Sequence, residues 1–281
     1  MKWPFFALFL LFLGLGNAQD TGPRKVRLPQ VLNEVSGLYI QSSDSLWWHN
    51  DSGGKAALYL TNRNGELSSV INIPAAENKD WEDLTYDTNG NVYIGDFGNN
   101  RRQRNDLRIY RHKLQTQQTE IIQFTYPQEK QYDVEAFLWF QDSLHLFTKS
   151  RISRADLTTY HFVIPAQAGL HQAILRDSLQ LRKRAVTAAA VDHTSGRMVL
   201  LAYYYTKRLG FVPYSAANVY CFESSSQGRW FQQPMRSRRI SFLVATQYES
   251  VDFLNPNQIL VASEQTLFIK AKAKRVKWKG K

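Results

Sequence analysis

Three carboxylates fall within one short segment, DWEDLTYDTNGNVYIGDFGNN, which runs from Asp80 to Asn100. Glu82 and Asp83 stand at the start of an apolar stretch, and Asp96 stands at the end of the next one. The Asn-Gly pair between these stretches predicts a β-hairpin. Carboxylates gathered in this way could bind a cation or transfer protons, but acids at strand ends are also common as solvated groups. The elements that position them decide between these interpretations.

The same hairpin pattern recurs along the chain. Each copy has a small or acidic first residue, an apolar strand, a polar turn and a second apolar strand. The copies are SGLYIQSSDSLWWHND from Ser36, EDLTYDTNGNVYIGDF from Glu82, EAFLWFQDSLHLFTKS from Glu135, TAAAVDHTSGRMVLLAYY from Thr187 and ESVDFLNPNQILVASE from Glu249. Their starts are 46, 53, 52 and 62 residues apart. Intervals of this size suit four-stranded blades.

We therefore predict an all-β protein, a β-propeller of five blades. A sixth blade is the alternative, because the long interval between Thr187 and Glu249 could contain a degenerate one. Residues 266–271 are expected to form the third strand of the last blade, and Lys25 to Leu32 could supply its missing outer strand and close the ring. Apolar runs in the inner strands fit blades that are buried on both faces.

In a propeller blade, the start of the first strand and the end of the second lie on the same rim of the central channel. An offset of about 14 residues then pairs Ser36 with Asn50, Glu82 with Asp96, Glu135 with Lys149 and Glu249 with Ser263, while the longer fourth hairpin pairs Thr187 with Tyr203. The candidate ligand-binding residues on this rim are Ser36, His49, Asn50, Asp51, Glu82, Asp96, Glu135, Lys149, Thr187, Tyr203, Glu249 and Glu264. Crowded glutamates must share protons, pair with Lys149, or hold a cation such as Ca²⁺.

Several segments resemble a family of exported bacterial β-propeller proteins common in Bacteroidetes. They are EVSGLY, WWHNDSGGKAALYLTN, DWEDLTYD, YIGDFGNNRRQRNDLRIYR, DVEAF, LFTKS and QYESVDF. This family is distantly similar to phytase-like and gluconolactonase-like (SMP-30-like) propellers. The resemblance implies the fold and export. The related lactonases hold a divalent cation, and by that similarity Glu82, Glu135, Asn50 and Asp96 would be candidate ligands, although Lys149 in the same ring departs from the pattern.

Two functions are compatible with this rim. The first is an exported protein that binds a small molecule or protein at the acidic mouth of its channel, and we favour it because no complete catalytic set is recognisable. The alternative is a hydrolase of an ester, lactone or phosphoester, dependent on a divalent cation held by Glu82, Asp96 and Glu135.

The first residues predict export. Lys2 precedes an apolar run from Phe5 to Leu15, and small residues follow at Gly16 and Ala18. Residues 1–18 therefore read as a cleaved signal peptide, and the run is too short to span a bilayer. We expect a secreted or periplasmic monomer with a propeller domain over residues 19–272.

The net charge of +11 is concentrated at the ends, because residues 270–281 contain seven cations. Without them the body is only mildly basic, and no nucleic-acid-binding motif is present, so we expect no nucleic-acid partner. Residues 273–281 are predicted to be a basic solvated tail.

Overall fold

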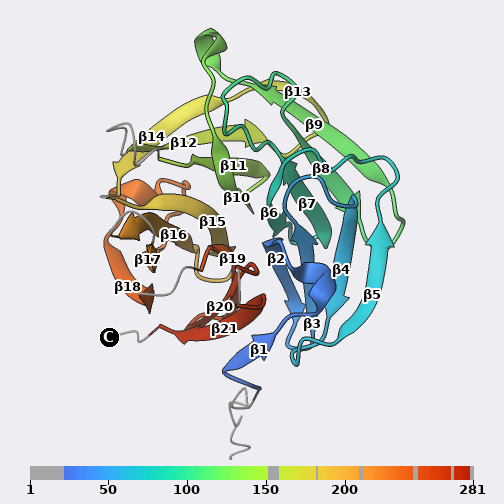
Figure 1. The fold of residues 1–281 in the computed structure, drawn as a ribbon. Coiled ribbons are helices and arrows are strands. Elements are labelled where there is room, and N and C mark those ends of the chain that lie inside the picture. Colours follow the sequence, from blue (N-terminus) through green and yellow to red (C-terminus); the bar gives the residue numbers. More distant parts are fainter. Residues whose placement is uncertain are drawn as a thin grey trace, which may run out of the picture.

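The computed structural model describes residues 22–150, 158–181, 183–208, 212–242, 246–266 and 269–278. The predicted signal peptide lies outside these residues. Five β-sheets are arranged around a central axis (Figure 1). The prediction of a five-bladed propeller is therefore confirmed.

The first three blades follow one another in the chain. Blade 1 contains β2 (Val35–Ser42), β3 (Ser45–Asn50), β4 (Ala57–Thr61) and β5 (Leu67–Asn72). Blade 2 contains β6 (Trp81–Tyr86), β7 (Asn91–Asp96), β8 (Arg108–Lys113) and β9 (Thr119–Thr125), with β13 (Gly169–Gln172) added in parallel to β9. Blade 3 contains β10 (Val134–Phe140), β11 (Ser143–Thr148), β12 (Thr158–Pro165) and β14 (Ile174–Gln180).

Blade 4 contains β15 (Ala185–Asp192), β16 (Arg197–Arg208), β17 (Val212–Phe222) and β18 (Met235–Phe242). The long interval that suggested a sixth blade is filled by β16 and β17, with 12 and 11 residues, and by a 3-10 turn at Trp230–Gln232. Two further 3-10 turns, Gln30–Leu32 and Pro127–Glu129, precede blades 1 and 3.

Blade 5 joins the two ends of the chain. It contains β19 (Tyr248–Asn255), β20 (Gln258–Ser263), β21 (Lys272–Lys277) and, as its outer strand, β1 (Lys25–Arg27). The N-terminal closure is thus confirmed. The third strand is not where the sequence suggested, because β21 lies in the segment expected to be a solvated tail. The expected solvated tail from residue 273 is therefore wrong, because β21 runs to Lys277, with Ala273 and Val276 buried and the two cations between them half-buried.

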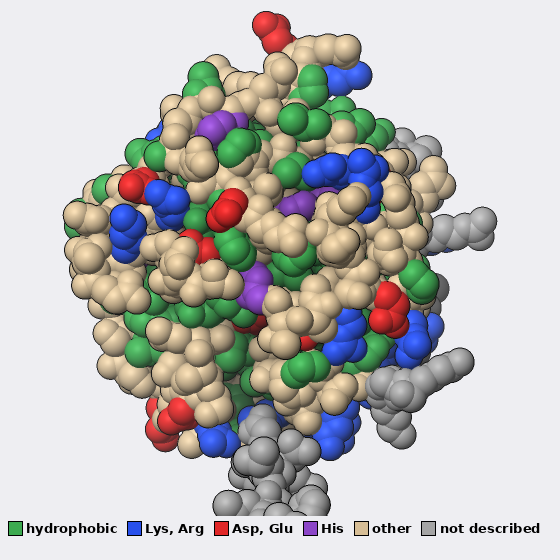
Figure 2. Space-filling view, turned by 180° about the vertical axis from the view of Figure 1, so that it is seen from behind, with side chains coloured by type: hydrophobic (Ala, Val, Ile, Leu, Met, Phe, Trp, Pro, Cys, Tyr) green, Lys and Arg blue, Asp and Glu red, His purple; other side chains and the backbone are tan. Residues whose placement is uncertain are grey.

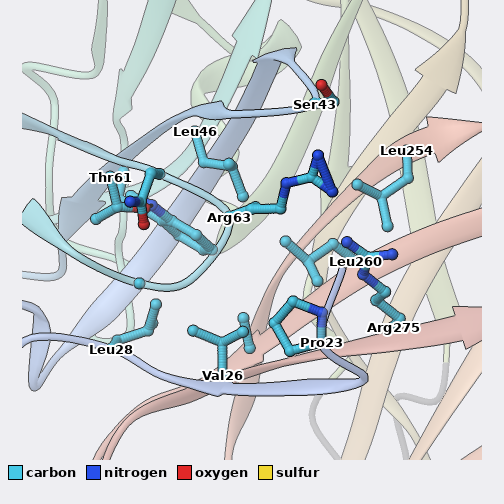
Figure 3. Close-up of a pocket in the computed structure, with 14 residues that line it drawn as sticks. Pro23, Val26, Leu28, Ser43, Leu46, Thr61, Arg63, Leu254, Leu260 and Arg275 are labelled. Carbon is cyan, nitrogen blue, oxygen red and sulfur yellow. Dashed lines mark hydrogen bonds between the residues drawn. The ribbon is translucent and has the colours of Figure 1, made fainter. Parts of the chain in front are cut away.

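One apolar cluster fills each of the five joints between neighbouring blades. At the joint between blades 5 and 1, Leu28 and Leu32 pack with Leu46, Trp48 and Leu260. Figure 3 shows Val26, Leu28, Leu46 and Leu260 around a crevice of about 20 Å³ there. That space is enough for about one water molecule, so the crevice is a packing seam.

The inner strand of every blade carries a β-bulge near its start. The bulged residues are Ser36, Glu82 with Asp83, Glu135, Thr187 and Glu249. Asn50 is consequently opposite Val35, and Asp96 is opposite Trp81, so the predicted register is wrong by one residue. In blade 4, Tyr203 is opposite Ala185 rather than Thr187. A bulge re-aims side chains that regular pleating would place alternately on the two faces.

Candidate functional site

The mouth of the channel gathers carboxylates from several blades. Asp51, Asp80 and Glu82 each offer a carboxylate oxygen, and these oxygens lie within 4.8 Å of one another. Glu82 stands at the bulge of β6, Asp80 just before that strand, and Asp51 just after β3. This acidic triad could hold a metal ion. It contains one of the three metal ligands predicted from the sequence, Glu82.

Gly98 makes room for the triad. A Cβ atom at this position would lie 2.1 Å from Oε1 of Glu82 and 2.5 Å from Oδ2 of Asp80. Its backbone N–H donates to the carbonyl of Asp80 at 3.1 Å. The Gly98 backbone therefore fixes the segment that carries Asp80 and leaves space for two of the three carboxylates.

The other two predicted metal ligands are engaged elsewhere. Oδ1 of Asp96 lies 3.0 Å from the guanidinium of Arg104, which also pairs with Asp106 at 3.0 Å. Asp96 further accepts the backbone N–H of Asp80 at 3.1 Å, so it helps to fix the backbone of one triad residue. Glu135 forms an ion pair with Nζ of Lys149 at 2.7 Å. The pairing with Lys149 that the sequence suggested is thus present.

On the other side of the mouth, the amide of Gln247 donates to both Glu249 and Glu264. This amide holds two carboxylates together and partly offsets their repulsion. Gln247 was missed in the sequence because the repeat pattern was read only from the glutamate onward. Its position, two residues before that glutamate, is also polar in blades 2 and 3, where it is Asp80 and Asp133.

Burial and mutual repulsion raise the pKa values of these acids. Burial is the larger cause for Glu82, whose pKa lies well above its usual range, and the charges of Glu135 and Asp51 add to it. The pKa of Glu135 is raised to about 8 by burial, although Lys149 acts in the opposite direction. Burial also raises the pKa of Glu249 to about 8, with Glu264 contributing, and that of Asp80 to about 6.

Lys149 carries the positive charge that partly compensates this ring. Burial alone would lower its pKa, but the negative charge of Glu135, with that of Glu82, raises it well above the ordinary value. The ammonium therefore stays protonated. Burial, with the charge of Glu249, raises the pKa of the Tyr203 phenol, so this side chain is neutral at the mouth.

Two predicted site residues join blades. The hydroxyl of Ser36 donates to the carbonyl of Glu82 at 2.5 Å, and that of Thr187 donates to the carbonyl of Tyr248 at 2.8 Å. Each bond runs from a bulge to the next blade. These hydroxyls hold the rim together at the positions where the other blades carry glutamates.

His49 and Asn50 are largely packed into the structure. His49 is fully buried, with its ring 5.5 Å from that of Trp81, and burial lowers its pKa to about 4. Its Nδ1 contacts the carbonyl of Asn50 at 2.9 Å. The Asn50 amide donates to the carbonyl of Val31 at 2.7 Å. His49 is therefore a neutral packing residue behind the mouth.

Deeper in the channel, two aspartates that sequence reasoning did not select bond to other blades. Asp83 joins blades 2, 3 and 4, and Asp252 joins blades 5 and 1. Asp83 accepts the backbone N–H groups of Phe137 at 3.1 Å and Ala189 at 3.0 Å, from blades 3 and 4. Asp252 of blade 5 accepts the N–H of Ile40 in blade 1 at 2.7 Å. The sequence indicated only local hydrogen bonding for Asp83, because nothing in one blade shows which backbone groups converge from the others.

Comparison with solved structures returns matches at low similarity. A chain of hydrazine synthase from Kuenenia stuttgartiensis matches with a TM-score of 0.41 and 9% identity over 90% of this chain, which spans 65% of that one. A protein provisionally assigned as a gluconolactonase matches with a TM-score of 0.49 and 11% identity, covering 92% of this chain and 94% of that one. The α-L-arabinofuranosidase Arb93A from Fusarium graminearum gives 0.47 and 10%, covering 91% and 98%.

These similarities are too distant to carry an argument about activity. No protein-family model and no curated protein sequence matches the chain. Among the described residues, no helix has the length and apolar character needed to cross a bilayer.

Proposed function

We propose that this protein acts outside the cytoplasm, secreted or periplasmic, and binds a small molecule or protein ligand at the acidic mouth of its propeller through a divalent cation. The observation that carries the proposal is the convergence of Asp51, Asp80 and Glu82 within 4.8 Å. The predicted signal peptide supports the location. We expect the protein to act as a monomer without a nucleic-acid partner.

The donor set fits a hard cation such as Ca²⁺. Carboxylate oxygens are the ligands that Ca²⁺ prefers, and three of them supply enough charge to offset the desolvation of the ion. The Gly98 backbone leaves the space that a side chain would fill. A cation here would also relieve the repulsion that raises the pKa values of Glu82 and Asp80.

Calorimetric titration of Ca²⁺ tests this proposal. Glu82→Gln and Asp80→Asn should each weaken binding by at least about tenfold, because each removes one charged ligand. Glu129→Gln is the matched control, since Glu129 is an exposed carboxylate in the turn before blade 3. Equal affinities in all four proteins would refute the site.

A cation-dependent hydrolase of an ester, lactone or phosphoester is the second candidate. It is favoured by one observation: Glu135 and Glu249 are buried at the same mouth, each with a pKa of about 8. Carboxyl groups that titrate near neutral pH suit general acid–base catalysis. A bound divalent cation would supply Lewis-acid polarisation of the substrate oxygen. Calcium-dependent turnover that Glu135→Gln abolishes, with Ca²⁺ affinity retained, would select this candidate.

A further inference from the structure

A groove of about 530 Å³ lies between the outer parts of blades 4 and 5, away from the channel. Residues of β18 and β21 line it together with the segment before β1. The cations that line it are Arg24, Arg238, Arg239, Lys274, Arg275 and Lys277. No carboxylate is among the described residues of its lining. Lys and Arg side chains are visible along the lower edge of the molecule in Figure 2, the edge where Figure 1 places β1 and β21.

The strand register in this region places like charges together. Lys25 of β1 is directly opposite Lys274 of β21, and Arg27 is directly opposite Lys272. Like charges in directly opposite positions destabilise a sheet. The closure of the ring needs the backbone of β1 and the apolar side chains beside it. Neutral residues at these paired positions would give a more stable sheet. The fold alone therefore does not account for these cations.

The groove has an excess of positive charge. Burial lowers the pKa of Lys274, and the nearby charges of Lys25 and Arg24 lower it further. Burial and Lys25 likewise lower the pKa of Lys272. A bound anion would remove this repulsion.

Two of the cations are held in place across the groove. Nζ of Lys274 donates to the carbonyl of Ile240 in blade 4 at 2.7 Å, and the guanidinium of Arg238 donates to the carbonyl of Lys277 in blade 5. Each side chain thus reaches from one blade to the other. An ammonium has three donors and a guanidinium five, so both keep further N–H groups for a ligand.

The basic surface extends beyond the space for one anion. A second hollow of about 340 Å³ shares Arg238 with the groove and adds Arg236 and Trp278.

We propose that this groove binds a soluble ligand that carries two or more linked phosphate groups. Guanidinium groups bind phosphate oxygens in pairs, and several cations along one concavity match several phosphates. A volume of this size also suits a small molecule, since ligand sites commonly measure about 300–1,000 Å³.

Calorimetric titration of inorganic tripolyphosphate, at low ionic strength and with EDTA present, tests the inference. EDTA removes divalent cations, so the result does not depend on the channel mouth. The wild-type chain should bind tripolyphosphate at least tenfold more tightly than inorganic phosphate, and binding should weaken as salt is added. Arg238→Gln with Lys274→Gln should lower the tripolyphosphate affinity at least tenfold.

The matched control is Lys130→Gln with Arg176→Gln, which removes the same charge from exposed positions near blades 2 and 3. It should retain the wild-type affinity. If the first pair does not fold, Arg24→Gln with Lys277→Gln removes two other cations of the same groove and should give the same loss. Equal losses in groove and control variants would overturn the inference, because net charge alone would then explain binding. Wild-type protein that binds phosphatidylglycerol vesicles but not tripolyphosphate would also overturn it, in favour of a membrane-facing surface.

Discussion

Five equivalent positions, one in the inner strand of each blade, decide what the channel mouth can do. Three of them are glutamates and two are hydroxyl residues. The bulge at each position turns the side chain toward the mouth or the neighbouring blade. The repeat pattern alone placed these residues near the starts of the inner strands, where they lie in the structure. What it did not supply was their partners, such as Asp80 and Gln247, because the hairpin pattern was read only from the bulge residue onward and both lie two residues before it.

The buried glutamates predict an unusual dependence of stability on pH. Glu135 and Glu249 have pKa values of about 8 in the folded protein, above the ordinary value of 4.5. The folded state therefore binds more protons than the unfolded state between these values, and the free energy of unfolding falls as pH rises through that range. In EDTA, the melting temperature should be higher near pH 5 than above pH 8. An unchanged or rising melting temperature over that interval would contradict the assigned burial.

The carboxyl groups of the acidic triad predict that cation binding strengthens with pH. A cation competes with protons for Glu82 and Asp80, and both carboxyls have raised pKa values. Calorimetric Ca²⁺ affinity should therefore increase as the pH rises through about 6, where Asp80 loses its proton. Glu82→Gln should flatten this dependence, because one of the titrating ligands is gone. A wild-type affinity that does not vary with pH would place the bound ion elsewhere.

Asp83 should be a large contributor to stability. Its carboxylate accepts three backbone N–H groups, two of them from other blades. Each buried N–H left without an acceptor costs about 1–3 kcal/mol, so Asp83→Ala should lower the free energy of unfolding by about 3 kcal/mol or more. Denaturant titration measures the change, and Glu129→Ala is the surface control. A loss below about 0.5 kcal/mol, typical of exposed sites, would contradict this assignment.

At the scale of the strands, the five hairpins were predictable because the inner strands are buried on both faces and read as apolar runs. The Asn-Gly turn after Asp87 is formed as expected, with Gly90 at a φ of +79°. The register was missed because an extra residue in a bulge leaves the sequence pattern unchanged. The strand β21 was missed because its cations dominate its composition, although Ala273 and Val276 are buried and the strand pairs with both β20 and β1.

Deletion of β21 should therefore strongly destabilise the protein. A chain ending at Ala271 loses the strand that pairs with both β20 and β1, which exposes two edges. We expect aggregation or a strongly lowered melting temperature by calorimetry. A chain ending at Trp278 is the control and should melt like the full-length protein. Similar melting of both truncations would show that β21 does not support blade 5.

At the scale of the whole molecule, the propeller carries two openings of opposite charge, one at the channel mouth and one on its outer side. The mouth collects carboxylates around Lys149, whereas the groove between blades 4 and 5 collects Lys and Arg. Five apolar clusters hold the blades together. The carboxylates of Asp83 and Asp252 also accept backbone N–H groups from other blades. A scaffold fixed in this way tolerates repulsive charge at its surface openings, where a bound ion or ligand would relieve it.

The most direct test of the central claim is the position of a bound cation in the molecule. Crystals grown with Ca²⁺ and measured at a long X-ray wavelength should show an anomalous difference peak between Asp51, Asp80 and Glu82. Carboxylate oxygens should lie about 2.3–2.6 Å from it. The peak should disappear in Glu82→Gln crystals. A wild-type map without a peak at the triad, or with its strongest peak elsewhere, would contradict the account.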